Sequence, residues 1–319
     1  MHSPHPLRMR VGRAFMDTAW TVLSHGFRKM PIARPDRHGV ACQYDIPYAP
    51  GGETHHLLDV YKPAKGTGPW PVVMYIHGGG FRILSKDSHW GMGLAFAKRG
   101  YLVFLVNYRL APKHRFPAAV EDVATALQWI VRHAHEYGGD ASRLVLAGES
   151  AGANLATSLA LTTAYRRDEP FARAVFDANI RPQAVIAKCG MYQVTDPNRF
   201  SRRKKLPGFL HDRIIEVSQS YLPTGSVPEG HLDLADPVVF LERGVRPERP
   251  LPPFFSSVGT ADPILDDTRR LHAALEKMGT RSEVRYYRGQ IHAFQAIQFL
   301  PNAKKYWSEM HGFLDEVLE

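Results

Sequence analysis

The chain has 319 residues, of which 44% are hydrophobic, and its formal net charge is +9 at pH 7. This apolar content suffices for a large core, so we expect one large α/β domain, or a core with a smaller attachment. No apolar run reaches the roughly 18–20 residues of a membrane span, and no signal peptide is recognisable, which predicts a cytoplasmic protein without stable membrane insertion. The basic residues are scattered, and the densest run, residues 202–205, carries no nucleic-acid-binding signature, so we expect no nucleic-acid partner.

Short apolar runs alternate with helical patterns along the chain. The predicted strands are residues 41–47, 57–61, 72–76, 102–108, 144–147, 184–188, 254–258 and 284–287. The predicted helices are residues 89–98, 118–135, 151–165, 264–278 and 303–317. Several strands are unbroken apolar runs, which is typical of parallel strands covered on both faces. The alternation predicts a doubly wound α/β sheet in which the first two strands supply an antiparallel start.

Two regions do not fit that sheet. Residues 1–40 carry apolar side chains at near-helical spacing between basic ones, and the segment between residues 190 and 253 is too long for an ordinary crossover, with a possible helix at 210–221. We interpret both as parts of a helical cap, although an arginine-rich amphipathic helix also suits a membrane anchor or a mitochondrial transit sequence. The predicted organisation is residues 1–40 as the first part of the cap, 41–190 as core, 191–235 as the second part of the cap and 236–319 as core.

The segment RLVLAGESAGANLATSLAL predicts a strand that turns directly into a helix. Ser150 stands at the apex of the turn, and Gly148 and Gly152 flank it at a distance of two residues. In such a turn the serine has strained dihedrals, and the glycines admit the close approach of neighbouring backbone. Ser150 would therefore project its hydroxyl from the carboxyl edge of the sheet, where open α/β sheets bind ligands. By itself the pattern equally suits a simple strand-to-helix connection.

A serine nucleophile needs a general base and an acid that orients the base. His292 follows the last predicted strand, and Asp262 follows the strand before it, so the order is serine, acid, histidine. Asp266 and Asp267 compete for the acid role, but both fall in the first turn of a helix, where the helix dipole already explains a carboxylate. We assign Asp262 as the partner of His292, with Asp266 next.

Three consecutive glycines, Gly78 to Gly80, follow the strand at residues 72–76 and the residue His77. Acyl transfer needs preorganised donors for an oxyanion, and a glycine loop can present its amides without obstruction by side chains. Gly78 and Gly79 are the predicted donors, and Ala151 at the helix N-terminus is a third. A phosphate-binding loop is excluded, because Phe81 follows and no Gly-Lys-Ser/Thr is present.

Metal and disulfide sites find no support in the sequence. Cys42 and Cys189 are the only cysteines, and both lie in apolar strand-like surroundings, so we expect small buried hydrophobic side chains. There is no H-E-x-x-H motif, and His133 and His135, two residues apart, point to different faces of a helix.

With these residues in view, the chain resembles the hormone-sensitive-lipase family of α/β-hydrolase carboxylesterases, also called bacterial lipolytic family IV. Beyond HGGG and GESAG, the resemblance rests on YRLAPKHRFPAAVEDV at residues 108–123, ADP at 261–263 and IHAF at 291–294. It extends from about Tyr48 to the C-terminus. The sequence departs from the family pattern at Glu149, where Asp or Thr is more usual, and at Lys113, where Glu is common.

The resemblance implies an α/β-hydrolase fold with a mostly parallel eight-stranded sheet, capped by N-terminal helices and an insertion after the sixth strand. It implies hydrolysis of short- to medium-chain carboxylic esters through an acyl-enzyme, without metal or organic cofactor. His77 and Gly80 would support the oxyanion loop, and Phe81 and Glu149 are candidates for substrate contact. We expect a small-molecule ester as partner and a monomer or homodimer. The alternative is an amidase or deacetylase that acts on acylated amines with the same triad.

Overall fold

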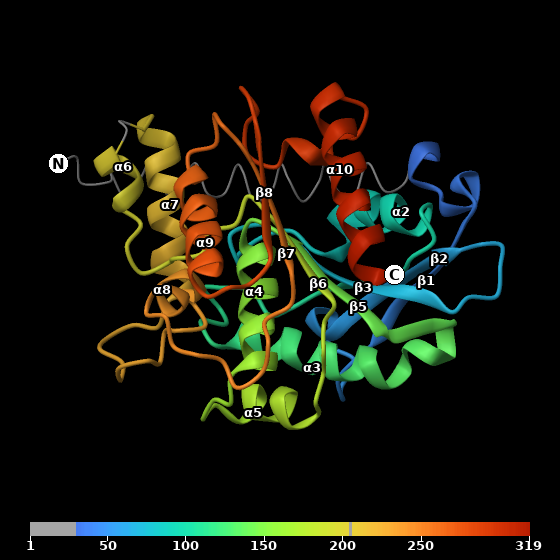
Figure 1. Cartoon of the computed structure of the whole chain (residues 1–319), viewed down its shortest axis with the longest axis horizontal. Helices are drawn as coiled ribbons and strands as arrows, with labels where there is room; N and C mark the ends of the chain where they lie inside the picture. The colour runs from blue at the N-terminus through green and yellow to red at the C-terminus, as the bar shows by residue number, and fades with distance from the viewer. Residues whose placement is uncertain (1–29, 204–205) are drawn as a thin grey trace.

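The computed structural model describes residues 30–203 and 206–319, and its centre is an eight-stranded sheet (Figure 1). The strand order is β1-β2-β4-β3-β5-β6-β7-β8. β1 and β2 pair antiparallel, β2 pairs antiparallel with β4, and all further pairs are parallel. The strands are β1 (Val40–Pro47), β2 (Leu57–Pro63), β3 (Trp70–Ile76), β4 (Leu102–Val106), β5 (Gly139–Glu149), β6 (Ala184–Lys188), β7 (Phe254–Gly259) and β8 (Ser282–Tyr287). The predicted fold, with its antiparallel start, is confirmed.

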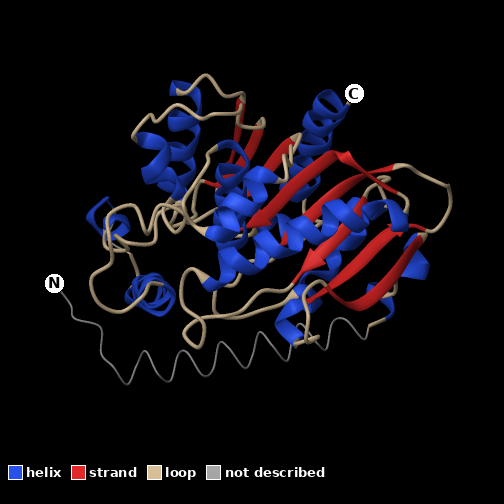
Figure 2. Cartoon of the chain, turned by 90° about the horizontal axis from the view of Figure 1, so that it is seen from below, coloured by secondary structure: helices blue, strands red, loops and turns tan. Residues whose placement is uncertain are grey.

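Helices cover both faces of the sheet (Figures 1 and 2). One face packs against α2 (Trp90–Ala97) and α10 (Pro301–Leu318). The other face packs against α3 (Ala118–His133), α4 (Ala151–Ala164) and α9 (Leu265–Lys277), while α5 (Pro170–Asp177) packs on α3 and α4, and α8 (Pro237–Glu242) packs on α4 and α9. Because both faces are covered, all five residues of β4 are buried, as the unbroken apolar run predicted.

The largest differences from the predicted elements lie in polar or short segments. β5 begins at Gly139, five residues before the predicted strand, because Gly139 and the polar Asp140, which give no apolar strand pattern, pair with Trp70 and Pro71 of β3. The predicted helix at 118–135 ends as an α-helix at His133 and continues as a short 3-10 turn. The short helices α5 and α8 lacked a long enough apolar period to be predicted.

The segment between β6 and β7 contains α6 (Arg199–Arg203) and α7 (Gly208–Tyr221), so the helix predicted at 210–221 is present and starts two residues earlier. α7 packs on the loop after β3: the ring of Tyr221 stacks on Phe81 at 3.7 Å, and Arg82 forms an ion pair with Glu216 at 3.0 Å. The N-terminal part of the predicted cap falls mainly on residues 1–29, which lie outside the described residues. Among the described residues, no helix has the length and apolarity of a membrane span.

Candidate active site

Ser150 occupies a sharp turn between β5, which ends at Glu149, and α4, which begins at Ala151. Its backbone angles are φ 54° and ψ −119°, a strained conformation for a residue with a side chain. The surrounding backbone holds it there: the N–H of Ser150 donates to the carbonyl of Lys188 at 2.8 Å, and its carbonyl accepts the N–H of Asn154 at 3.2 Å. This is the strained strand-to-helix turn that the sequence predicts around a nucleophilic serine.

The two glycines that flank Ser150 are required by close backbone packing. A Cβ added at Gly148 would lie 2.2 Å from the carbonyl oxygen of Gly152. A Cβ added at Gly152 would lie 2.1 Å from the carbonyl oxygen of Ile76. The first oxygen belongs to the first turn of α4 and the second to the end of β3, so neither can move without shifting α4 or β3, and both positions exclude every residue with a side chain. α4 thereby packs directly against the end of β3, beside the glycine loop.

The glycine loop begins next to Ser150. A Cβ at Gly78 would lie 3.4 Å from the Cβ of Ser150, and Gly79 has φ 111°, where only glycine is unstrained. Among the described residues, no hydrogen bond engages the N–H groups of Gly78, Gly79 or Ala151, whereas the carbonyl of Gly79 accepts from the N–H of Ile83 at 3.1 Å. Three backbone donors beside the serine therefore remain available to an anionic oxygen.

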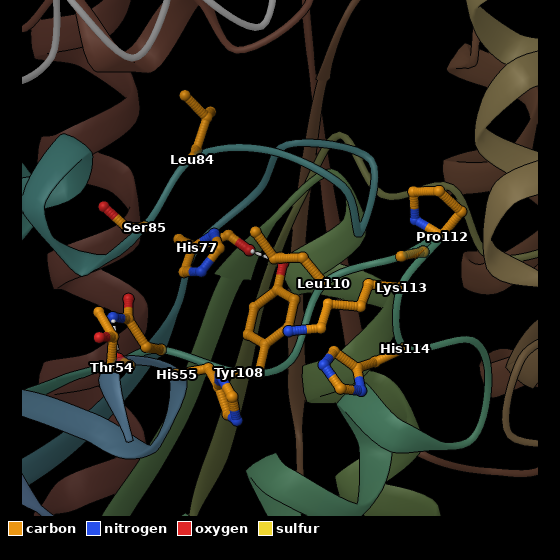
Figure 3. A pocket seen from close by; sticks show the side chains of 12 residues that line it. Thr54, His55, His77, Leu84, Ser85, Tyr108, Leu110, Pro112, Lys113 and His114 are labelled. Atoms are coloured by element: carbon orange, nitrogen blue, oxygen red, sulfur yellow. Dashed lines mark hydrogen bonds between the residues drawn. The ribbon is translucent and has the colours of Figure 1, made fainter. Parts of the chain in front are cut away.

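His77 is buried behind this loop and braces it. Its Nδ1 lies 2.7 Å from the carbonyl oxygen of Gly78, and its ring stacks on Tyr108 with centroids 4.3 Å apart. The hydroxyl of Tyr108 in turn donates to the carbonyl of His77 at 2.9 Å (Figure 3). Burial, together with the nearby His89, lowers the pKa of His77 to about 3, so the ring is neutral at pH 7. Because a carbonyl can only accept, Nδ1 carries the proton and donates it to Gly78.

Asp262 and His292 come together as the sequence predicts. His292 Nδ1 lies 2.8 Å from Asp262 Oδ2, and Asp262 Oδ1 accepts the N–H of Ile264 at 3.0 Å. The two competing carboxylates are engaged elsewhere: Asp266 pairs with Arg269, and Asp267 accepts the N–H of Tyr192 and pairs with Arg199. Asp262 and His292 follow the neighbouring parallel strands β7 and β8, and their carboxyl ends lie at the same edge of the sheet as Ser150.

A thiol that the sequence did not place in the site lies beside this pair. Cys189 follows β6 and is buried, whereas Cys42 is only half-buried. Burial alone would lower the pKa of His292, but its interactions with Cys189 and Asp262 raise that pKa well above its usual value of 6.5. Cys189 was predicted only as a small apolar side chain, because residues 189 and 292 are far apart in the sequence and no motif links them.

A buried ionic cluster lies directly behind Ser150. The carboxylate of Glu149 is 2.9 Å from His89 Nε2 and 3.9 Å from Lys188 Nζ, and Lys188 donates to the hydroxyl of Tyr75 at 2.8 Å. Burial alone would raise the pKa of Glu149, but His89 and Lys188 lower it to about 2. Burial lowers the pKa of Lys188 to about 8. The one signal in the sequence is the lysine that ends the otherwise apolar strand AVIAK.

Glu149 and Phe81, the two residues predicted to contact substrate, both make contacts inside the protein. The carboxylate of Glu149 is satisfied by protein partners, and Phe81 is fully buried under Tyr221. Both side chains support the site from behind, and their contact with substrate stays a prediction.

A cavity of about 620 Å³ borders the segment that follows β3, through His77, Leu84 and Ser85 (Figure 3). Its lining includes His77, Tyr108, Lys113, His114 and His55, but not Ser150, Asp262 or His292. Lys113, which departs from the family pattern, therefore faces this cavity rather than the reacting groups.

Comparison with known proteins identifies the family. Residues 73–296 match the family described as alpha/beta hydrolase fold. The chain belongs to this family. A Mycobacterium tuberculosis protein named carboxylesterase NlhH is 30% identical over 247 residues, which cover 76% of this chain and 72% of the relative. An acetyl esterase of Salmonella paratyphi A is 29% identical over 260 residues, covering 79% and 72%.

Solved structures agree on the fold. A bacterial heroin esterase superposes with a TM-score of 0.77 at 22% identity and covers 95% of this chain and 91% of its own. A hyperthermophilic esterase from the archaeon Pyrobaculum calidifontis gives a TM-score of 0.75 at 23% identity and covers both chains completely, at 100% each. The family match and the named relatives confirm the predicted resemblance to the hormone-sensitive-lipase-like carboxylesterases and the predicted carboxylic ester hydrolase activity, and nothing favours the amidase alternative.

Proposed function

We propose that this α/β-hydrolase cleaves carboxylic esters through an acyl-enzyme formed on Ser150, with Asp262 and His292 as its acid and base. The hydrogen bond of 2.8 Å between His292 Nδ1 and Asp262 Oδ2 carries this proposal. In the neutral imidazole, which forms above the raised pKa of His292, this bond keeps the remaining proton on Nδ1 and leaves Nε2 as the acceptor for a serine hydroxyl. The strained serine at the same edge of the sheet supplies that hydroxyl.

The reaction has two halves. His292 takes the proton of Ser150 as its oxygen attacks the ester carbonyl, and then gives that proton to the leaving alcohol. The N–H groups of Gly78, Gly79 and Ala151 stabilise the oxyanion, each by roughly 2.7–4 kcal/mol in the transition state. A water molecule, deprotonated by the same histidine, then releases the acid. Asp262 stabilises the imidazolium in both halves.

The substrate class is the finer part of the proposal. We expect esters of short- to medium-chain acids, and the acetyl esterase among the relatives supports the short end of this range. An amidase would use the same groups, so the test compares rates on matched nitrophenyl esters and nitroanilides. Ester rates that exceed anilide rates at every chain length are the expected outcome, and the reverse order would contradict it.

The nucleophile is tested with the same graded series of nitrophenyl esters. Ser150→Ala should lower kcat by a factor on the order of 10⁶, because the covalent route is lost. Ser201→Ala, in α6 and outside the site, is the matched control and should keep the wild-type rate. If Ser150→Ala retains more than a small residual rate, the assignment of the nucleophile is wrong.

We also propose a division of the chain into a catalytic core and a helical cap. Residues 191–235 would form one part of a cap, supported by the contacts of Tyr221 with Phe81 and of Glu216 with Arg82, and residues 1–40 the other part. We place the protein in the cytoplasm as a monomer or homodimer with a small-molecule ester as its partner. Neither cysteine forms a disulfide, which suits a reducing compartment, and sedimentation would report the oligomeric state.

A further inference from the structure

Cys189 is buried at the end of β6 and has no role in the reaction described above. Its backbone has φ 39°, and its N–H donates to the carbonyl of Ser257 at 2.7 Å, so the start of the side chain is held in place. The sulfur of Cys189, a carboxylate oxygen of Asp262 and a ring nitrogen of His292 all lie within 4.8 Å of one another. The neighbouring parallel strands β6, β7 and β8 bring these three ligand types to one point.

We propose that Cys189, Asp262 and His292 form a binding site for Zn²⁺, and that the bound ion reversibly inhibits the enzyme. Zinc binds thiolate sulfur at about 2.3 Å, imidazole nitrogen at about 2.0–2.1 Å and carboxylate oxygen at about 2.0–2.2 Å. Donor atoms around one tetrahedral ion are therefore roughly 3–4 Å apart. The observed cluster needs only a small adjustment of side chains to reach that geometry.

The surroundings of the three ligands suit a metal site. Asp262 is oriented by the N–H of Ile264, and the side-chain amide of Gln295 lies 3.7 Å from the sulfur of Cys189. Such outer contacts fix the direction of metal ligands. The side chain of His292 is 35% exposed, which gives an ion a path to the cluster, while that of Asp262 is fully buried. Three protein ligands leave one tetrahedral position open to solvent.

Inhibition follows from the identity of two of the ligands. An ion bound by His292 and Asp262 removes the hydrogen bond between them, or occupies the nitrogen that must accept the proton of Ser150. Either arrangement stops the reaction at its first step. This consequence rests on the proposed function, whereas binding of the ion to the cluster does not.

A second group of possible ligands provides the matched control. Glu53, His55 and His56 also bring ligand atoms within 4.8 Å of one another, but they lie toward the surface, where His55 pairs with Glu53 and His56 with Asp122. This group contains no thiol and is distant in sequence from the reacting residues. Loss of His55 should leave inhibition unchanged.

The first experiment measures ester hydrolysis against zinc chloride in buffer without thiols or chelators. Wild-type enzyme should be inhibited and should recover after EDTA. In Cys189→Ser, measured against its own metal-free rate, half-inhibition should require more than about 100-fold more zinc, since loss of an outer contact alone costs 10–100-fold in metal affinity. His55→Asn and Cys42→Ser should behave as wild type. Equal inhibition of Cys189→Ser, or none of the wild type, would overturn the proposal.

The second experiment reads metal binding without turnover. Ser150→Ala is titrated with Co²⁺, and coordination by the thiolate should produce a sulfur-to-cobalt charge-transfer band in the near ultraviolet. The band should be absent from the double variant Ser150→Ala/Cys189→Ser. Because this readout needs no catalysis, it stays decisive even if the proposed esterase mechanism fails. A titration of Ser150→Ala without the band would contradict the site.

Discussion

The nucleophile half of the site and its acid–base half are held in place by different physics. Ser150 and the glycine loop are fixed by backbone packing, with a Cβ at Gly148 or Gly152 only 2.2 or 2.1 Å from a carbonyl oxygen. Asp262 and His292 instead lie on loops after β7 and β8 and are fixed by hydrogen bonds of 3.0 and 2.8 Å. The nucleophile half has no room for a side chain at Gly148 or Gly152, and the acid–base half depends on the negative charge of Asp262.

This difference predicts how each half fails. A methyl group added at Gly148 or Gly152 should disturb the fold itself, because the obstructing atoms are backbone oxygens of α4 and β3. A charge removed from the acid–base half should leave the fold intact and abolish only the chemistry. Substitutions that separate stability from turnover therefore test whether the two halves are as distinct as their contacts indicate.

The largest effect on stability is expected at Gly152. In Gly152→Ala the new Cβ meets the carbonyl oxygen of Ile76 at 2.1 Å and that of His77 at 2.6 Å, so the free energy of unfolding should fall by more than about 3 kcal/mol. Gly312→Ala is the control: it lies in α10 with nothing within 4 Å and should gain about 0.5–1 kcal/mol. Urea unfolding midpoints measure both. If Gly152→Ala unfolded at the wild-type urea midpoint, the steric explanation would be wrong.

Asp262→Asn should abolish turnover and leave the stability of the fold nearly unchanged. It should lower kcat by about 10⁴-fold, because the amide cannot stabilise the imidazolium or hold the correct tautomer, while circular dichroism shows a folded protein. Asp266→Asn, on the first turn of α9 and paired with Arg269, should change kcat little. If Asp266→Asn were the more damaging of the two, the acid would have been misassigned.

Gly78 belongs to the nucleophile half, but its substitution should lower turnover more than stability. In Gly78→Ala the Cβ would lie 3.0 Å from the carbonyl oxygen of Glu149 and 3.4 Å from the Cβ of Ser150, which is tight but tolerable. We expect a stable protein whose kcat falls by up to about 100-fold, since small displacements of reacting groups are that costly. Gly79→Pro is a poorer test, because φ 111° at Gly79 is far from the φ of proline, near −65°. A Gly78→Ala protein with unchanged kcat would show that the loop tolerates crowding of the serine.

The two halves also differ in how far the sequence predicts them. The turn at Ser150 follows from local sterics, since the spacing of glycine and serine dictates a strand that turns into a helix. The partnership of Asp262 and His292 could be placed by strand order alone. The thiol of Cys189 and the ammonium of Lys188 could not be placed, because each lies beside the site through pairing of β6 with its neighbours. Sequence spacing carries no signal for such contacts.

The most gradual effect concerns stability in acid and separates His77 from a buried histidine outside the site. Burial lowers the pKa of His77 to about 3, and burial with the nearby Arg99 lowers that of His311, in α10, to about 4. Both folded-state values lie below the ordinary 6.5 of an unfolded chain, so the unfolded state binds protons first as the pH falls. Stability should therefore drop from pH 6.5 downward, by up to about 1.4 kcal/mol per pH unit for each histidine, until each folded-state pKa is reached.

Urea unfolding between pH 7 and 4.5 measures how the free energy of unfolding falls with pH. This fall should be shallower in both His77→Asn and His311→Gln than in the wild type. Turnover distinguishes them. His77→Asn should also lower kcat, because the donor to the carbonyl of Gly78 and the ring that stacks on Tyr108 are altered. His311→Gln should keep the wild-type kcat, since the ring of His311 packs against Phe96, Tyr101 and Trp307 and not against the glycine loop. Equal losses of kcat in the two variants would mean that His77 stabilises the protein in general and does not brace the loop.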